Sequence, residues 1–122
     1  MPRYAASGTT AGAPAWRTHK PDSLVASLGP YIHPVLRGKL AETAREHNIA
    51  LQTAAVPRTT STDADELGAA RGGVPTVLLE LPLKYMHTTV ELMDWKTLKE
   101  GGRLLAHFAA AVSASWEDEL WI

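Results

Sequence analysis

Histidine is the residue type in this sequence best suited to chemistry, since imidazole binds metals and exchanges protons near neutral pH. The chain contains five histidines, at His19, His33, His47, His87 and His107. Four have structural explanations, because they lie in the N-terminal segment or at helix starts and ends, and no two have the i, i+4 spacing of a helical zinc motif. His87 differs, because it shortly follows the apolar run 74–81 and has Glu91 four residues later. From spacing alone, a structural role and metal binding both stay open for His87.

The remaining polar residues do not form a recognisable catalytic set. Asp63 follows Ser61 and Thr62, a Ser/Thr/Asp cluster that also suits a helix N-cap. Ser61 lacks a nucleophile-elbow pattern, Gly72-Gly73 lacks the rest of a phosphate loop, and the absence of cysteine excludes a thiolate nucleophile. No catalytic residue is therefore assigned, and serine hydrolase and nucleotide-binding functions are not supported.

Composition limits the class of protein. With 122 residues, 12 Lys+Arg and 13 Asp+Glu, the chain predicts one domain or part of one, without the excess charge of a nucleic-acid binder. No run approaches the roughly 20 apolar residues of a membrane span, and the first 16 residues lack a secretory apolar region. We expect a soluble cytoplasmic protein with no nucleic-acid and no membrane partner.

The elements that must position these side chains follow from apolar periodicity and from turn residues. Residues 1–27 predict a loosely ordered lead-in, and residues 28–122 a folded portion. The predicted elements are a helix from His33-Pro34 to about Asn48, a strand over 49–56, a short helix over 62–71, a strand over 74–81 and a helix from Asp94 to about Val112. This alternation predicts a layered α/β fold.

The strand over 74–81 is the longest apolar run, and we expect it to be the central strand, buried on both faces. The last helix is predicted to pack on it through Trp95, Leu98, Leu105 and Val112, which recur at helical spacing. His87 would then lie beyond the carboxyl end of a central strand, where open α/β sheets bind ligands.

Two segments carry a family resemblance. TDADELGAARGGVPT (residues 62–76) and LKYMHTTVE (residues 83–91) resemble the C-terminal part of the tetrahedral, or deblocking, metalloaminopeptidases, glutamyl aminopeptidase-like enzymes also labelled cellulase M or endoglucanase. That family has a Gly-Thr-Asp-Ala motif, a Gly-Val-Pro strand start and Tyr-x-His-Ser followed by Glu. Upstream, Gly29-Pro30 and His33-Pro34 also match. The resemblance covers roughly residues 28–112.

The resemblance implies part of a zinc-aminopeptidase catalytic domain of the phosphorylase/hydrolase-like type, with helices on a mixed sheet and a peptide as substrate. Family members hold two zinc or cobalt ions with two His, two Asp and a Glu, and a neighbouring Glu is the general base. His87 corresponds to the last metal ligand. Thr62, Asp63 and Glu91 would line the same site, where they orient substrate or support the ligands.

The resemblance also places four of the five ligands and the general base upstream of residue 1. We therefore expect the isolated chain to be inactive, to expose an apolar surface where the missing half docks, and to depend on a complementing chain or a homo-oligomer. The alternatives are a non-catalytic α/β interaction module that keeps the fold without the chemistry, and an unrelated α/β domain that matches by chance.

Overall fold

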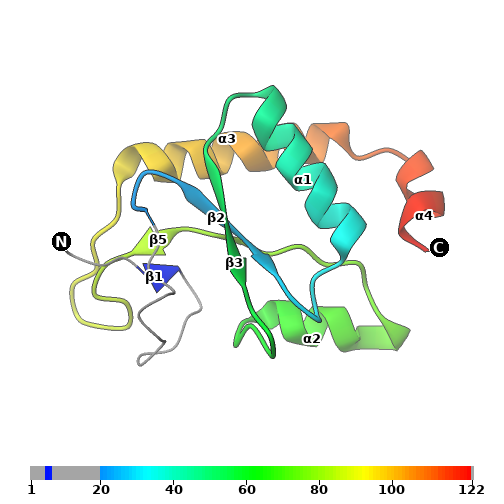
Figure 1. Cartoon of the computed structure of the whole chain (residues 1–122), viewed down its shortest axis with the longest axis horizontal. Coiled ribbons are helices and arrows are strands. Elements are labelled where there is room, and N and C mark those ends of the chain that lie inside the picture. The colour runs from blue at the N-terminus through cyan, green and yellow to red at the C-terminus, as the bar shows by residue number, and fades with distance from the viewer. Residues whose placement is uncertain (1–4, 7–19, 122) are drawn as a thin grey trace.

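A computed structural model describes residues 5–6 and 20–121 of the chain (Figure 1). The elements are, in order, β1 (Ala5–Ala6), β2 (Leu24–Leu28), α1 (Pro34–Glu46), β3 (Leu51–Ala55), α2 (Asp63–Ala69), the 3-10 turn η2 (Ala70–Gly72), β4 (Leu79–Glu80), β5 (Pro82–Leu83), α3 (Trp95–Ala111) and α4 (Ser115–Leu120). The layered α/β prediction is confirmed. None of the helices in the described ranges is long and apolar enough to cross a membrane.

The main sheet has the strand order β3-β2-β4, with β2 parallel to β3 and antiparallel to β4. A separate two-residue ladder joins β1 to β5. The helix α1 connects the two parallel strands, so β2, α1 and β3 form a β-α-β unit. Two parallel strands that follow one another in the chain need such a crossover connection.

The prediction of a central strand over 74–81 was wrong. Only Leu79–Glu80 of that run is a strand, and it lies at the edge of the main sheet. The central strand is β2, of which residues 24–27 are buried although we had placed them in the lead-in. Its sequence, LVASL, is short and mixes Leu and Val with Ala and Ser, so nothing in its pattern distinguishes a buried strand from a loop. The rest of the predicted lead-in lies mostly outside the described residues.

The helices α1, α2 and α3 begin where the sequence predicts, whereas α4 was not predicted. The caps of α1 and α3 explain the agreement. The ring Nδ1 of His33 accepts the backbone N–H of Leu36 at 3.4 Å, and Pro34 occupies the first turn of α1. Asp94 accepts the backbone N–H of Thr97 at 2.8 Å and so caps α3.

The core lies where α1 and α3 meet one face of the sheet. Leu24 and Ala26 of β2 point to this face, because alternate residues of a strand share a side. Leu40 and Ala44 of α1, Leu104 of α3 and Ile49 complete the cluster, and all six residues are at most 5% exposed.

The helix α3 buries a different face from the one predicted. Trp95, Leu105 and Val112 are 65%, 54% and 57% exposed. The buried positions are Thr97, Gly101 and Leu104. At Gly101 the missing side chain allows a close approach to the sheet, since a Cβ there would lie 3.3 Å from the Cδ2 atom of Leu24.

Candidate functional site

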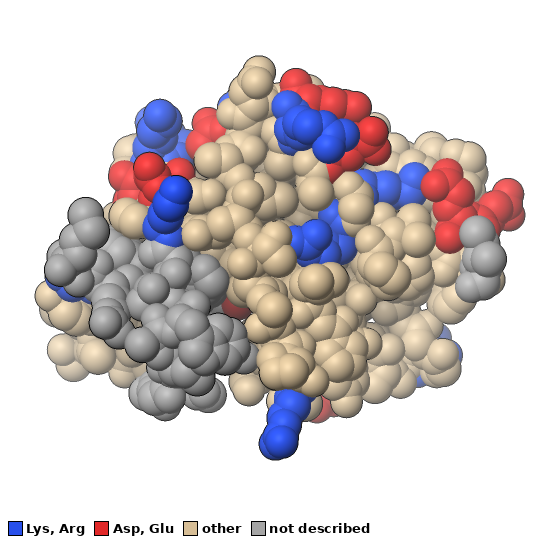
Figure 2. Space-filling model, in the orientation of Figure 1, with Lys and Arg blue, Asp and Glu red and all other residues tan. Residues whose placement is uncertain are grey.

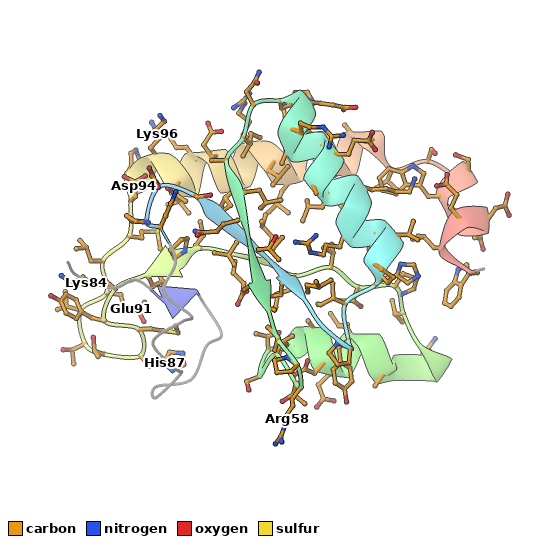
Figure 3. The ribbon with its side chains drawn as sticks, viewed as in Figure 1. Arg58, Lys84, His87, Glu91, Asp94 and Lys96 are labelled. Atoms are coloured by element: carbon orange, nitrogen blue, oxygen red, sulfur yellow. The ribbon has the colours of Figure 1, made fainter. Side chains whose placement is uncertain are left out.

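His87 lies in a loop between β5 and α3, closed at its base by an isolated antiparallel bridge. Lys84 donates its backbone N–H to the carbonyl of Leu92 at 2.8 Å, and Leu92 donates back to Lys84 at 3.0 Å. Figure 3 shows His87 and Glu91 within this loop, with Lys84 at its base. The loop over 84–92 is therefore a closed hairpin-like unit that presents one histidine.

Inside this loop the backbone is held in an unusual conformation. Tyr85 and His87 have φ angles of 60° and 61°, in the left-handed region that costs energy for residues with a side chain. Two contacts stabilise the shape: the carboxylate oxygen Oε1 of Glu91 accepts the backbone N–H of His87 at 2.8 Å, and the Thr88 hydroxyl donates to the Tyr85 carbonyl at 2.6 Å. Glu91 thus acts on the main chain of His87.

The imidazole of His87 is exposed, and within the described ranges no hydrogen bond or ion pair engages its ring. The residue is therefore open to a ligand from outside, with neither ring nitrogen hydrogen-bonded to the described residues. A neutral imidazole with an accessible nitrogen is a suitable ligand for zinc or cobalt.

Thr62 and Asp63 lie at the start of α2. The hydroxyl of Thr62 accepts the backbone N–H of Ala64 at 3.2 Å, so Thr62 is the N-cap and Asp63 is the first helical residue. The Ser/Thr/Asp cluster therefore caps α2 as predicted, through Thr62 and not through Asp63. Its carboxylate is exposed and accepts no hydrogen bond from the described residues, so it is accessible to a substrate or a partner.

The sequence analysis did not single out Asp65, which organises the turn before α2. Its carboxylate accepts the backbone N–H and the hydroxyl of Thr60 at 2.9 and 2.8 Å, and the backbone N–H of Ser61 at 2.9 Å. Desolvation raises the pKa of Asp65, but these hydrogen bonds outweigh it and hold the pKa below its ordinary value. An acidic residue in the first helical turn, three positions after Thr62, was the available signal.

Ser61 has a φ of 60°, at a position where this sequence departs from the family motif. The motif has glycine at this position, and glycine adopts a left-handed backbone without steric cost. Serine keeps the same backbone here, with its N–H bound by Asp65. The turn that leads to Thr62 and Asp63 is therefore maintained despite the substitution.

In the described part of the chain, the two segments do not together form a metal site. Among the described residues, no group of three or more His, Cys, Asp or Glu side chains could hold a metal ion. No hydrogen bond or ion pair within the described ranges joins His87 to Thr62 or Asp63. The donor set consists of one accessible imidazole and separate carboxylates, which does not suffice for a pair of metals.

The structure thus shows a layered α/β fold with a closed histidine loop, and comparison with known proteins identifies the family to which the chain belongs. Residues 20–104 match the model of the M42 glutamyl aminopeptidases. The chain belongs to this family. A lysyl aminopeptidase from Pyrococcus furiosus is 44% identical over 70 residues, which cover 57% of this chain and 20% of that protein.

Two solved structures are similar in fold. A proposed peptidase/endoglucanase aligns with a TM-score of 0.68 and 37% identity over 86% of this chain and 32% of its own. A TET aminopeptidase from a marine sediment Thaumarchaeota archaeon aligns with a TM-score of 0.72 over 91% of this chain and 32% of its own, and at 18% identity it shows the fold alone. The chain thus spans about a third or less of the length of these relatives.

Proposed function

We propose that this chain supplies the C-terminal portion of a dinuclear metalloaminopeptidase site, with His87 as one metal ligand, and that it hydrolyses peptides only in combination with the upstream portion. The observation that carries the proposal is the accessible imidazole of His87, presented on a closed loop within the family-matched residues 20–104. The closed loop holds the backbone of His87 and leaves its ring without a hydrogen bond to the described residues, as a metal ligand requires.

Among residues 5–6 and 20–121, no group of three or more His, Cys, Asp or Glu side chains could hold a metal ion. The upstream portion would supply the other ligands and the general base. In the complete site the metals would polarise the substrate carbonyl and activate water. This chain would contribute the imidazole of His87, a loop geometry enforced by Glu91, and the exposed carboxylate of Asp63 for orienting the peptide.

The charge distribution supports a peptide rather than a nucleic acid as the ligand. Lysine and arginine side chains are interspersed with aspartate and glutamate on the face shown in Figure 2, most visibly over α1 and near α4. The net charge of −1 gives no general attraction to phosphates. The side chain of Arg58, labelled at the bottom of Figure 3, projects away from the ribbon.

The test is aminopeptidase turnover with zinc or cobalt on leucyl and lysyl chromogenic substrates. We expect negligible turnover from the purified chain, and metal-dependent turnover when it is co-expressed with an upstream M42 portion. His87→Asn is the informative variant, because asparagine tolerates the left-handed backbone and removes the imidazole. It should reduce bound metal, measured by elemental analysis, by about one ion per complex and abolish turnover. His87→Ala should lose the same metal and activity.

The matched control is Thr89→Ala, an exposed loop residue whose side chain makes no hydrogen bond with the described residues. It should keep metal and activity. Turnover by the isolated chain that survives His87→Asn would show the site assignment to be wrong. A stable complex that binds no metal in the wild-type form would instead favour the non-catalytic interaction module.

A further inference from the structure

The helix α3 carries an apolar surface that the described part of this chain only partly covers. At about 100° per residue, the buried positions Thr97, Gly101 and Leu104 cluster on one side of the helix. A second apolar row lies roughly a quarter-turn away and consists of Trp95, Leu98, Gly102, Leu105, Ala109 and Val112. Because the two rows adjoin, the apolar arc of α3 is about twice as wide as the face that packs on the sheet.

The second row borders an apolar groove of about 530 Å³. Leu98, Gly102 and Leu105 form its α3 side, and the chain around β4, including Val77 and Leu79, forms the opposite side. Within the described strands, β4 is the last of the main sheet on this side. The groove therefore lies along the β4 edge of the main sheet, where additional secondary structure could pack and extend the core.

We propose that this groove binds the N-terminal portion of an M42 catalytic domain. The inference rests on the proposed function and adds the surface through which the two portions join. An exposed apolar strip next to a groove with an apolar lining is typical of an interaction surface. All of its lining residues except Leu105 and Phe108 fall within the family-matched range 20–104.

The lengths of the relatives favour this occupant over a second copy of the chain. The two solved structures align with 86% and 91% of this chain. In each case the aligned part is only 32% of the solved chain. In each of them the equivalent piece is part of a polypeptide about three times as long. A second copy of this chain would duplicate the same third and would supply none of the remaining structure.

The experiment co-expresses the full 122-residue chain with the tagged N-terminal portion of the Pyrococcus furiosus lysyl aminopeptidase, ending before the 70 matched residues. Leu105→Glu places a carboxylate in the groove, whereas Ala106→Glu places one at the adjacent exposed position outside it. We expect the wild-type chain and Ala106→Glu to co-purify with the tagged portion, and Leu105→Glu to bind at least about tenfold more weakly. Because Leu105 is 54% exposed, both variants should melt within a few degrees of each other.

Equal capture of the two variants would overturn the proposal, as would the absence of any wild-type complex. Self-association that Leu105→Glu abolishes, without capture of the tagged portion, would overturn the chosen occupant in favour of a second copy. His87→Asn separates the groove from the proposed function. If the complex forms with groove-dependent affinity but neither metal content nor activity responds to His87→Asn, the groove assignment stands and the metal-ligand proposal fails.

Discussion

The carboxylate of Glu91 accepts the backbone N–H of His87 at 2.8 Å, so the residue four positions after the histidine holds its main chain. Removing this acceptor by Glu91→Ala should loosen the left-handed turn at His87, and the exchange rate of its amide proton should rise about 5- to 10-fold. Glu91→Gln keeps an acceptor oxygen and should restore most of the protection. Hydrogen exchange by NMR measures the effect, and equal exchange rates in the two variants would contradict it.

The interaction between Glu91 and His87 also predicts how substitutions of Glu91 would change metal affinity in the proposed complete site. If Glu91 acts through loop geometry, Glu91→Ala should weaken metal affinity while Glu91→Gln retains it, because the amide oxygen can accept the same N–H. If the charge of Glu91 itself supported the ligand, both variants would weaken binding equally. Competition with a chromophoric chelator distinguishes the two.

The turn before α2 should contribute to stability in a pH-dependent manner through Asp65. Because its pKa is lowered in the folded chain, the unfolded chain binds more protons around pH 4. The stabilisation is therefore complete above about pH 5 and is lost as the pH falls through the lowered pKa. Asp65→Asn should lower Tm at pH 7, and calorimetry should show the difference from wild type shrinking toward pH 3.

Two glycines should respond oppositely to alanine. A Cβ on Gly29 would clash with the backbone carbonyl oxygen of Val56, which cannot move independently of the sheet. Gly29→Ala should therefore destabilise the fold by about 1–3 kcal/mol. Gly38 lies within α1 with no atom near its potential Cβ, so Gly38→Ala should stabilise by about 0.5–1 kcal/mol. Urea denaturation measures both changes, and a neutral Gly29→Ala would contradict the close approach.

The contact between α1 and α3 should include a measurable coupling between two histidines. The rings of His47 and His107 stack with their centroids 3.5 Å apart and their planes 10° from parallel. Arg103 supports the same junction by donating to the carbonyl of His47 at 2.7 Å. In a double-mutant cycle with alanine at both positions, we expect a coupling of about 0.5–1 kcal/mol. Purely additive single substitutions would argue against it.

Local signals predicted α1, α2 and α3 well, but they missed α4 and predicted the sheet poorly. The starts of α1 and α3 could be read from Pro34 and Asp94, because caps and first-turn prolines act within a few residues. The strand over 49–56 contains the observed β3, and the turn residues after it mark where it ends. The position of a strand within a sheet depends on distant partners, so the apolar run 74–81 was mistaken for the centre and β2 was missed.

The predicted face of α3 failed for a related reason. The row containing Trp95, Leu98 and Leu105 is a genuine apolar periodicity, but periodicity does not specify which molecule covers it. At the loop site, the motif indicated His87 as a candidate metal ligand, and that role stays a prediction; the structure shows that the residue is exposed. The contact of Glu91 with the backbone could not be inferred, because it depends on the left-handed turn.

The contiguous β2-α1-β3 unit also affects the order in which the chain folds. Leu24 pairs with Leu51, whereas Val25 pairs with Glu80 across a connecting stretch about twice as long. Closing the shorter loop costs less entropy, so we expect the parallel pair to form first and β4 to dock on an existing template. Substitutions in α1 should then slow folding, and substitutions around β4 should mainly accelerate unfolding. The groove beside β4 would consequently be among the last surfaces to form, after the nucleus is complete.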